Sequence, residues 1–189
     1  EHSIARLRER YQADCFFVLF RKRLWNPAQN RFMGWERKRG KIEEFNRLIL
    51  GKGETTFVVP SDVRQLLEGV RYCITLDNDS QLPRGVVREL VGTIAHPVNC
   101  PVLTEDRTRI ASGYSIIQPR TGVALLSANT SRFSAIFSGH AGLDPYTQTV
   151  SEVYQDLFQQ GSFIGKGIYD IDAFYPALGR RVPGNSRVS

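Results

Sequence analysis

The chain has 189 residues, of which 41% are apolar and 23% charged, and it carries a formal net charge of +6. This length allows one domain with a buried core, and the composition excludes a disordered chain or a fibre. Three scattered cysteines without CxxC spacing argue against a disulfide scaffold or zinc site, and the longest apolar run, residues 15–20, is too short to cross a bilayer.

Helix and strand patterns alternate along the chain, which is typical of an α/β fold. Apolar residues at helical spacing predict helices, and short β-branched or aromatic runs predict strands. The strands expected at residues 16–20 and 72–76 are predicted to be buried. The segment from Arg21 to Trp35 is expected to be irregular around a turn at Asn26-Pro27. The expected helices span residues 2–12, 42–50, 61–67, 83–95 and 150–158, and the expected strands span 16–20, 55–59, 72–76 and 113–118.

Positive charge is concentrated in residues 1–52, which hold 13 Lys and Arg against 6 Asp and Glu. Part of it is the run Arg37-Lys38-Arg39-Gly40-Lys41, directly before the helix expected from Ile42. Cations are unfavourable at a helix N-terminus, where an anion is stabilised, so a bound phosphate would resolve the conflict. A solvated surface, a nucleic-acid site and an anionic membrane surface are the alternatives.

Two acidic residues, Asp77 and Asp79, follow the strand expected at residues 72–76. In an extended backbone residues i and i+2 point the same way, so both carboxylates would face one point. Like charges this close repel unless a cation lies between them, and a hard divalent ion prefers such oxygen ligands together with substrate phosphates. Asp77-Asn78-Asp79-Ser80 is equally good turn and N-cap sequence, so both interpretations stay open.

A glycine-rich segment, residues 161–170, follows the last expected helix. Its alternating glycines would let the backbone approach a ligand closely, although a simple turn between strands explains them as well. Asp170 and Asp172 come at an expected helix start, where capping accounts for them.

Taken together, three motifs resemble the glycosyltransferase domain of cyclic β-1,2-glucan synthases: residues 35–41, residues 75–84 and residues 162–170. Tyr114 to Arg120 and Asp144-Pro145-Tyr146 fit as well. The resemblance covers nearly the whole chain and implies part of a GT-A (Rossmann-like) nucleotide-sugar transferase fold, a mixed sheet flanked by helices. Residues 1–189 would then be the central part of one glycosyltransferase domain, truncated at both ends.

The resemblance implies transfer of glucose from UDP-glucose to a growing β-1,2-glucan with inversion, assisted by Mg²⁺ or Mn²⁺. Asp77 and Asp79 would hold the metal, and Arg39 and Lys41 the diphosphate. The family's catalytic base is expected just beyond Ser189, so the isolated chain is expected to be inactive. Other residues would line the donor and acceptor sugars: Gln118, Arg120, Gly165, Lys166 and Gly167.

The resemblance also implies the remaining polypeptide of the parent protein, with its membrane segments, as a partner. This segment is expected to be soluble, at the cytoplasmic face of a bacterial inner membrane, and not to bind nucleic acid.

Two other classes of protein stay open on the residues alone. A haloacid-dehalogenase-type phosphatase also has Asp-x-Asp after a strand, with a further acidic pair downstream. A basic nucleic-acid-binding module would bind with a steep salt dependence.

Overall fold

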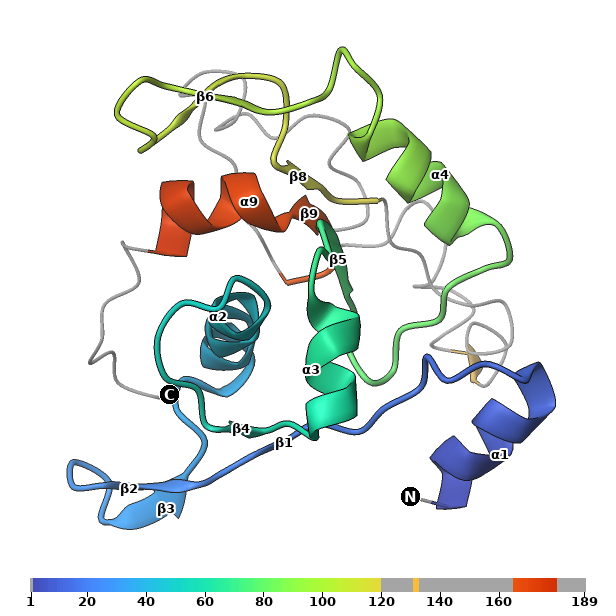
Figure 1. The fold of residues 1–189 in the computed structure, drawn as a ribbon, viewed down its shortest axis with the longest axis vertical. Helices are drawn as coiled ribbons and strands as arrows, with labels where there is room; N and C mark the ends of the chain where they lie inside the picture. The colour runs from blue at the N-terminus through green and yellow to red at the C-terminus, as the bar shows by residue number, and fades with distance from the viewer. Residues whose placement is uncertain (1, 120–130, 133–164, 180–189) are drawn as a thin grey trace.

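The structure is a computed structural model that describes residues 2–119, 131–132 and 165–179 (Figure 1). Predictions for residues 150–158, 161–164 and 180–189 lie outside this part. The helices are α1 (His2–Tyr11), α2 (Arg37–Ile49), α3 (Ser61–Leu67), α4 (Val86–Ile94) and α9 (Ile171–Phe174), which continues as a π-helix, Tyr175–Gly179. The strands are β1 (Phe20–Arg21), β2 (Leu24–Asn26), β3 (Arg31–Met33), β4 (Phe57–Val58), β5 (Tyr72–Thr75), β6 (Val102–Leu103), β7 (Ile110–Ser112), β8 (Ile116–Ile117) and β9 (Gly167–Asp170).

The predicted mixture of helices and strands is confirmed. The described strands form three two-stranded sheets and one three-stranded sheet, all paired antiparallel, so the Rossmann-like arrangement stays a prediction. No described helix combines the length and apolar character needed to span a bilayer.

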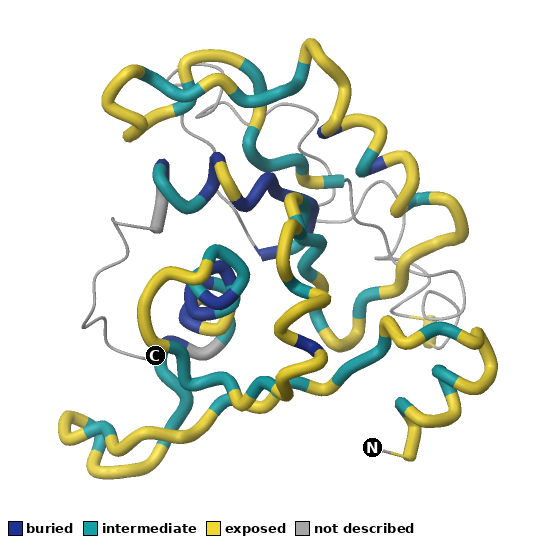
Figure 2. The backbone as a smooth tube through the Cα atoms, in the orientation of Figure 1, coloured by how far each residue is buried: buried dark blue, intermediate teal, exposed yellow. Residues whose placement is uncertain are grey.

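The three-stranded sheet has the order β5–β9–β8, with β9 in the middle and buried throughout. Side chains alternate between the two faces of a strand, and β9 shows this clearly. Ile168 packs with Leu90 and Ile94 of α4, whereas the next residue, Tyr169, packs with Ile42 of α2. The two helices therefore lie on opposite faces of this sheet, and the buried residues gather between them (Figures 1 and 2).

The N-terminal strand predictions are partly wrong. The strand expected to be buried at residues 16–20 is reduced to Phe20 and Arg21, and Phe20 is 63% exposed. It pairs only with the two-residue β4, so no sheet is available to cover it. The segment expected to be irregular contains a hairpin, β2–β3, in which Trp25 lies opposite Phe32.

The turn expected at Asn26 is confirmed, because its Oδ1 accepts from the backbone N–H groups of Ala28 and Gln29. Other boundaries shift. Helix α2 begins at Arg37, five residues before the expected start, so the basic run forms its first turn. Helix α4 begins at Val86, and Val87 of its expected apolar face is exposed. The strand expected at residues 113–118 is only Ile116–Ile117.

Candidate functional site

Three chain segments meet at one end of the three-stranded sheet. Strands β5 and β8 both run antiparallel to β9, so their carboxyl ends lie beside its amino end. Thr75 pairs with Gly167, and Ile117 pairs with Ile168. Asp77 after β5, Gln118 after β8 and Lys166 before β9 are therefore brought to the same edge, although they come from distant parts of the sequence.

A fourth segment, the first turn of α2, supplies Lys38. Its ammonium group makes an ion pair with Oδ1 of Asp77, and Lys166 Nζ lies 3.1 Å from Oδ2 of the same carboxylate. The side chains of Lys38, Asp77 and Lys166 are 37%, 35% and 33% exposed, so the cluster is open to solvent. Hydrogen bonds from Lys38 and then Lys166 hold the pKa of Asp77 below its usual value.

Two predicted glycines shape this edge by lacking side chains. Gly165 has a φ of +81°, and a Cβ placed on it would lie 3.0 Å from Lys38 Cε and 3.1 Å from Nζ. A Cβ on Gly167 would lie 2.5 Å from the carbonyl oxygen of Ile117 and 3.2 Å from Gln118 Cα. Gly165 thus leaves room for Lys38 to reach Asp77, and Gly167 lets β8 and β9 come together.

The two acidic residues do not lie on an extended backbone. Asp77-Asn78-Asp79-Ser80 is a turn, in which the Ser80 N–H donates to the Asp77 carbonyl oxygen over 3.1 Å. The argument that both carboxylates face one point, because residues i and i+2 of an extended backbone point the same way, is therefore wrong. The turn alternative is confirmed, but the N-cap alternative is not, because Gly85 precedes α4. Asp79 is exposed and makes no ion pair with a described residue.

The residues at this edge could hold a divalent ion only if substrate phosphates complete its ligands and the lysines leave it room at Asp77. The described residues contain no cluster of three or more His, Cys, Asp or Glu that could hold a metal by themselves. Magnesium commonly takes one or two carboxylates together with substrate phosphates, and Asp77 and Asp79 could provide these. However, each oxygen of Asp77 already contacts a lysine, so an ion on Asp77 would lie beside two ammonium groups of the same sign unless one of them moves.

The other predicted diphosphate residues are placed differently. Arg39 pairs with Glu36, with Nη2 and Nε at 2.5 and 3.1 Å from its Oε2. Lys41 is exposed on α2, and no ion pair joins either residue to Asp77. Gln118 is exposed beside Gly167, and Arg120 lies outside the described residues.

Lys38 is the residue that the sequence analysis did not select from the basic run. Ile42, Phe45 and Ile49 lie four, seven and eleven residues after it, so Lys38 continues the face of α2 that they occupy. Ile42 and Ile49 of this face pack against the sheet residue Tyr169 and its neighbours. Extending the helical pattern back by one turn would have identified Lys38 as the lysine nearest to the sheet.

The downstream acidic pair lies at the other end of the sheet. Asp170 pairs with Tyr72 at the start of β5, whereas Asp77 follows the end of that strand. The carboxylate of Asp170 accepts from the backbone N–H of Ala173 over 3.1 Å and from Arg71 Nε over 2.9 Å. The predicted capping role is confirmed for Asp170, whereas Asp172 lies in the first turn of α9. This position does not suit a phosphatase pair next to Asp77.

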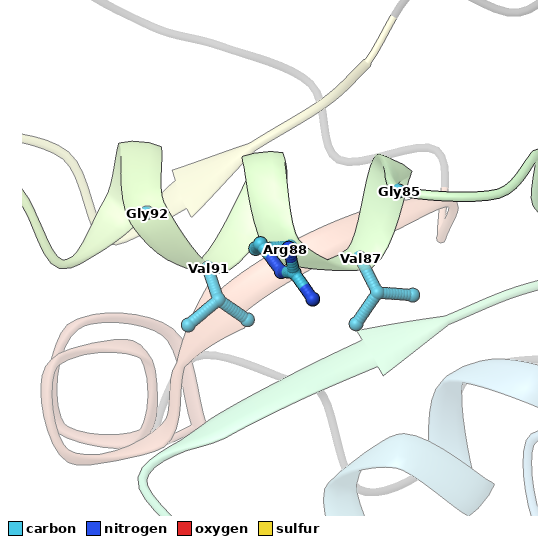
Figure 3. A pocket seen from close by; sticks show the side chains of 5 residues that line it. All are labelled: Gly85, Val87, Arg88, Val91 and Gly92. Atoms are coloured by element: carbon cyan, nitrogen blue, oxygen red, sulfur yellow. The ribbon is translucent and has the colours of Figure 1, made fainter.

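The concave region along α4 holds none of the predicted site residues. It has a volume of about 620 Å³, and its described lining comes from two turns of this helix and the glycine before it (Figure 3). These residues are Gly85, Val87, Arg88, Val91 and Gly92. The candidate site is therefore the lysine-lined edge around Asp77 and not this hollow.

Two lysines and an aspartate from three separate segments thus meet at one end of a sheet in a mixed α/β chain. Comparison of the sequence with known proteins shows which protein the chain resembles. The chain is 44% identical over its whole length to the cyclic beta-(1,2)-glucan synthase NdvB of Rhizobium meliloti (strain 1021), and it spans 7% of that protein. The resemblance indicated by the sequence motifs is thereby confirmed. No protein-family profile matches the chain.

Proposed function

We propose that the chain forms part of the glycosyltransferase domain of a cyclic β-1,2-glucan synthase. In this role it would have a GT-A-type fold and bind UDP-glucose, from which glucose passes to a growing β-1,2-glucan. The observation that carries the proposal is the convergence of Lys38, Asp77 and Lys166 at one sheet end. This edge belongs to a chain with 44% identity to a named cyclic glucan synthase.

Lys38 and Lys166 are the groups that would receive the sugar-nucleotide diphosphate. Each carries three N–H donors on a flexible stem, and lysine is a common phosphate ligand. Both reach Asp77 from different segments, so they already point at one place. Asp77 and Asp79 would hold Mg²⁺ or Mn²⁺, which would offset the negative charge that builds up on the leaving diphosphate.

The reaction is a displacement at the anomeric carbon of glucose. A hydroxyl oxygen of the acceptor forms the new bond to this carbon, the bond to the β-phosphate oxygen breaks, and UDP leaves with the electron pair. A general base takes the hydroxyl proton. Asp170 does not suit this role, because it caps α9, pairs with Arg71 and lies at the far end of β9. Lys38 and Lys166 would stabilise the departing diphosphate electrostatically.

Several basic residues near the N-terminus are matched with carboxylates, which favours this proposal over nucleic-acid binding. Arg21 pairs with Glu44, Arg39 with Glu36, and Arg47 with Glu43. Gln118 is proposed to contact a sugar, because it follows β8 at the same edge as Lys166. The β-1,2-glucan acceptor and the remaining parent polypeptide are the proposed partners.

Titration calorimetry with UDP tests the proposal. Binding is expected in the presence of Mn²⁺ and is expected to weaken strongly when a chelator removes the ion. Asp79→Asn should abolish the metal-dependent part while leaving the melting temperature nearly unchanged, because this carboxylate makes no described ion pair. Asp14→Asn is the matched control, since Asp14 is also exposed. Equal UDP binding with and without the ion would refute the metal role, and no binding under either condition would refute the proposed function.

A further inference from the structure

Both oxygens of the Asp77 carboxylate contact cations of the chain itself. Lys38 contacts one oxygen, and Lys166 lies 3.1 Å from the other. A divalent ion placed on this carboxylate would have to share it with two ammonium groups of the same sign. Because like charges at such distances repel, the lysines and the ion compete for Asp77.

We propose that Lys38 and Lys166 act as exchangeable counter-cations, which occupy Asp77 when the site is empty and transfer to the diphosphate when Asp77 takes a divalent ion. This inference rests on the proposed function for the identity of the diphosphate. The competition itself depends only on the two lysines and Asp77.

The charges at this edge favour joint binding of the ion and the diphosphate. Lys38 and Lys166 balance Asp77 and Asp79, so these four side chains have no net charge. A divalent ion alone would leave an excess of two positive charges, and a diphosphate diester alone an excess of two negative charges. Both together restore neutrality. Each ligand should therefore increase the affinity for the other, which is a reciprocal coupling.

The structure also shows how the lysines could move. About a third of each lysine side chain is exposed, and each ammonium group stands at the end of a flexible four-carbon stem. Gly165 has no side chain beside the end of Lys38, so this stem is not held by a neighbouring Cβ. Asp79 is exposed and makes no described ion pair, so it offers a second carboxylate without displacing any described partner.

The test measures Mn²⁺ binding without nucleotide, by electron paramagnetic resonance of the free ion. Lys38→Met and Lys166→Met should each tighten Mn²⁺ binding about two- to fivefold, the factor expected when a partly exposed ion pair is lost. Lys22→Met is the matched control, because it removes the same charge from an exposed lysine without a described ion pair. With Mn²⁺ present, the first two variants should instead weaken UDP binding.

Tighter Mn²⁺ binding together with weaker UDP binding would distinguish the exchange from a general effect of losing a positive charge. Tighter Mn²⁺ binding in the Lys38 and Lys166 variants, with no UDP binding by any protein, would support the competition for Asp77 but refute the transfer to a diphosphate and the proposed function. Metal-dependent UDP binding, with Mn²⁺ affinity unchanged in both lysine variants, would refute the exchange and leave the proposed function in place. Absence of Mn²⁺ binding in every variant would also overturn the exchange. If circular dichroism shows that one variant does not fold, the other decides.

Discussion

Replacing Tyr169 with Phe tests the contact between α2, which carries Lys38, and β9, which directly follows Lys166. Tyr169 lies in β9, and its hydroxyl donates to Oδ1 of Asn46 in α2 over 2.7 Å. Both residues are 0% exposed, and Nδ2 of Asn46 has no hydrogen-bond partner among the described residues. The substitution would therefore leave the Asn46 side chain buried with neither end satisfied by a described group.

The expected cost follows from this burial. A typical hydrogen bond contributes about 1 kcal/mol net, but leaving a buried polar group unsatisfied costs about 1–3 kcal/mol. We expect Tyr169→Phe to lower the free energy of unfolding by about 1–3 kcal/mol. Urea unfolding followed by tryptophan fluorescence measures this change, with the denaturant slope unchanged.

Tyr114→Phe is the matched control for the loss of a hydroxyl group. Tyr114 is 53% exposed, and its side chain makes no described hydrogen bond. It should change stability by less than about 0.5 kcal/mol, as surface substitutions usually do. A loss of less than about 0.5 kcal/mol in Tyr169→Phe as well would refute the reasoning, because a buried pair would then behave like an exposed one.

Two further predictions concern ionisable groups. The carboxyl of Asp106 accepts hydrogen bonds from Thr104 and Thr108, which lower its pKa from 3.8 to about 2. NMR titration should show a higher pKa for Asp106 in Thr104→Ala, because one of these hydrogen bonds is lost. The stabilisation from Asp106 should be complete above pH 3.8 and disappear as the pH falls towards 2; titration at the ordinary value would contradict the structure. Burial raises the pKa of the Cys73 thiol, so iodoacetamide should modify exposed Cys15 well before Cys73, as followed by mass spectrometry. Equal rates at the two cysteines would show that Cys73 is accessible.

The sequence predicted the elements that pack on the central sheet better than those near the N-terminus. Leu90 and Ile94 have the spacing of one helical face, and both are buried against β9 as this pattern indicates. The apolar run at residues 16–20 gave no comparable information. Whether such a run is buried depends on its partner strands, and β1 finds only the short β4.

Part of the candidate site was also accessible from sequence. Asp77 was selected from a local motif and Lys166 from the family resemblance, and the structure places both at one edge. The partner Lys38 depended on where α2 begins, and helix boundaries are the least reliable part of a sequence-based assignment. With the helix starting at Ile42, Lys38 would lie in a loop without a defined direction. With the start at Arg37, it lies on the helical face that points towards the sheet.

Gly165 connects this local geometry to ligand binding, so Gly165→Ala is an informative last substitution. The new Cβ would lie 3.0–3.4 Å from three atoms at the end of the Lys38 side chain, which can move aside more easily than the backbone. Lys38 should then shift by a few tenths of an ångström, which weakens its ion pair with Asp77. By the competition proposed for Asp77, the weaker ion pair should tighten Mn²⁺ binding without nucleotide, by less than the about two- to fivefold expected for complete loss of one partly exposed ion pair.

Gly53→Ala is the control, because Gly53 has a φ of +78° and its added Cβ would meet no atom within 4 Å. Both variants should lose about 1–2 kcal/mol of stability from the left-handed backbone conformation. Electron paramagnetic resonance of the free Mn²⁺ separates this strain from the displacement of Lys38, since only Gly165→Ala introduces the steric contact. If both alanine variants bind Mn²⁺ equally tightly, the space beside Gly165 does not control the position of Lys38. Lys38→Met should tighten Mn²⁺ binding less in the Gly165→Ala background than in the unchanged chain, because the alanine has already weakened the ion pair between Lys38 and Asp77.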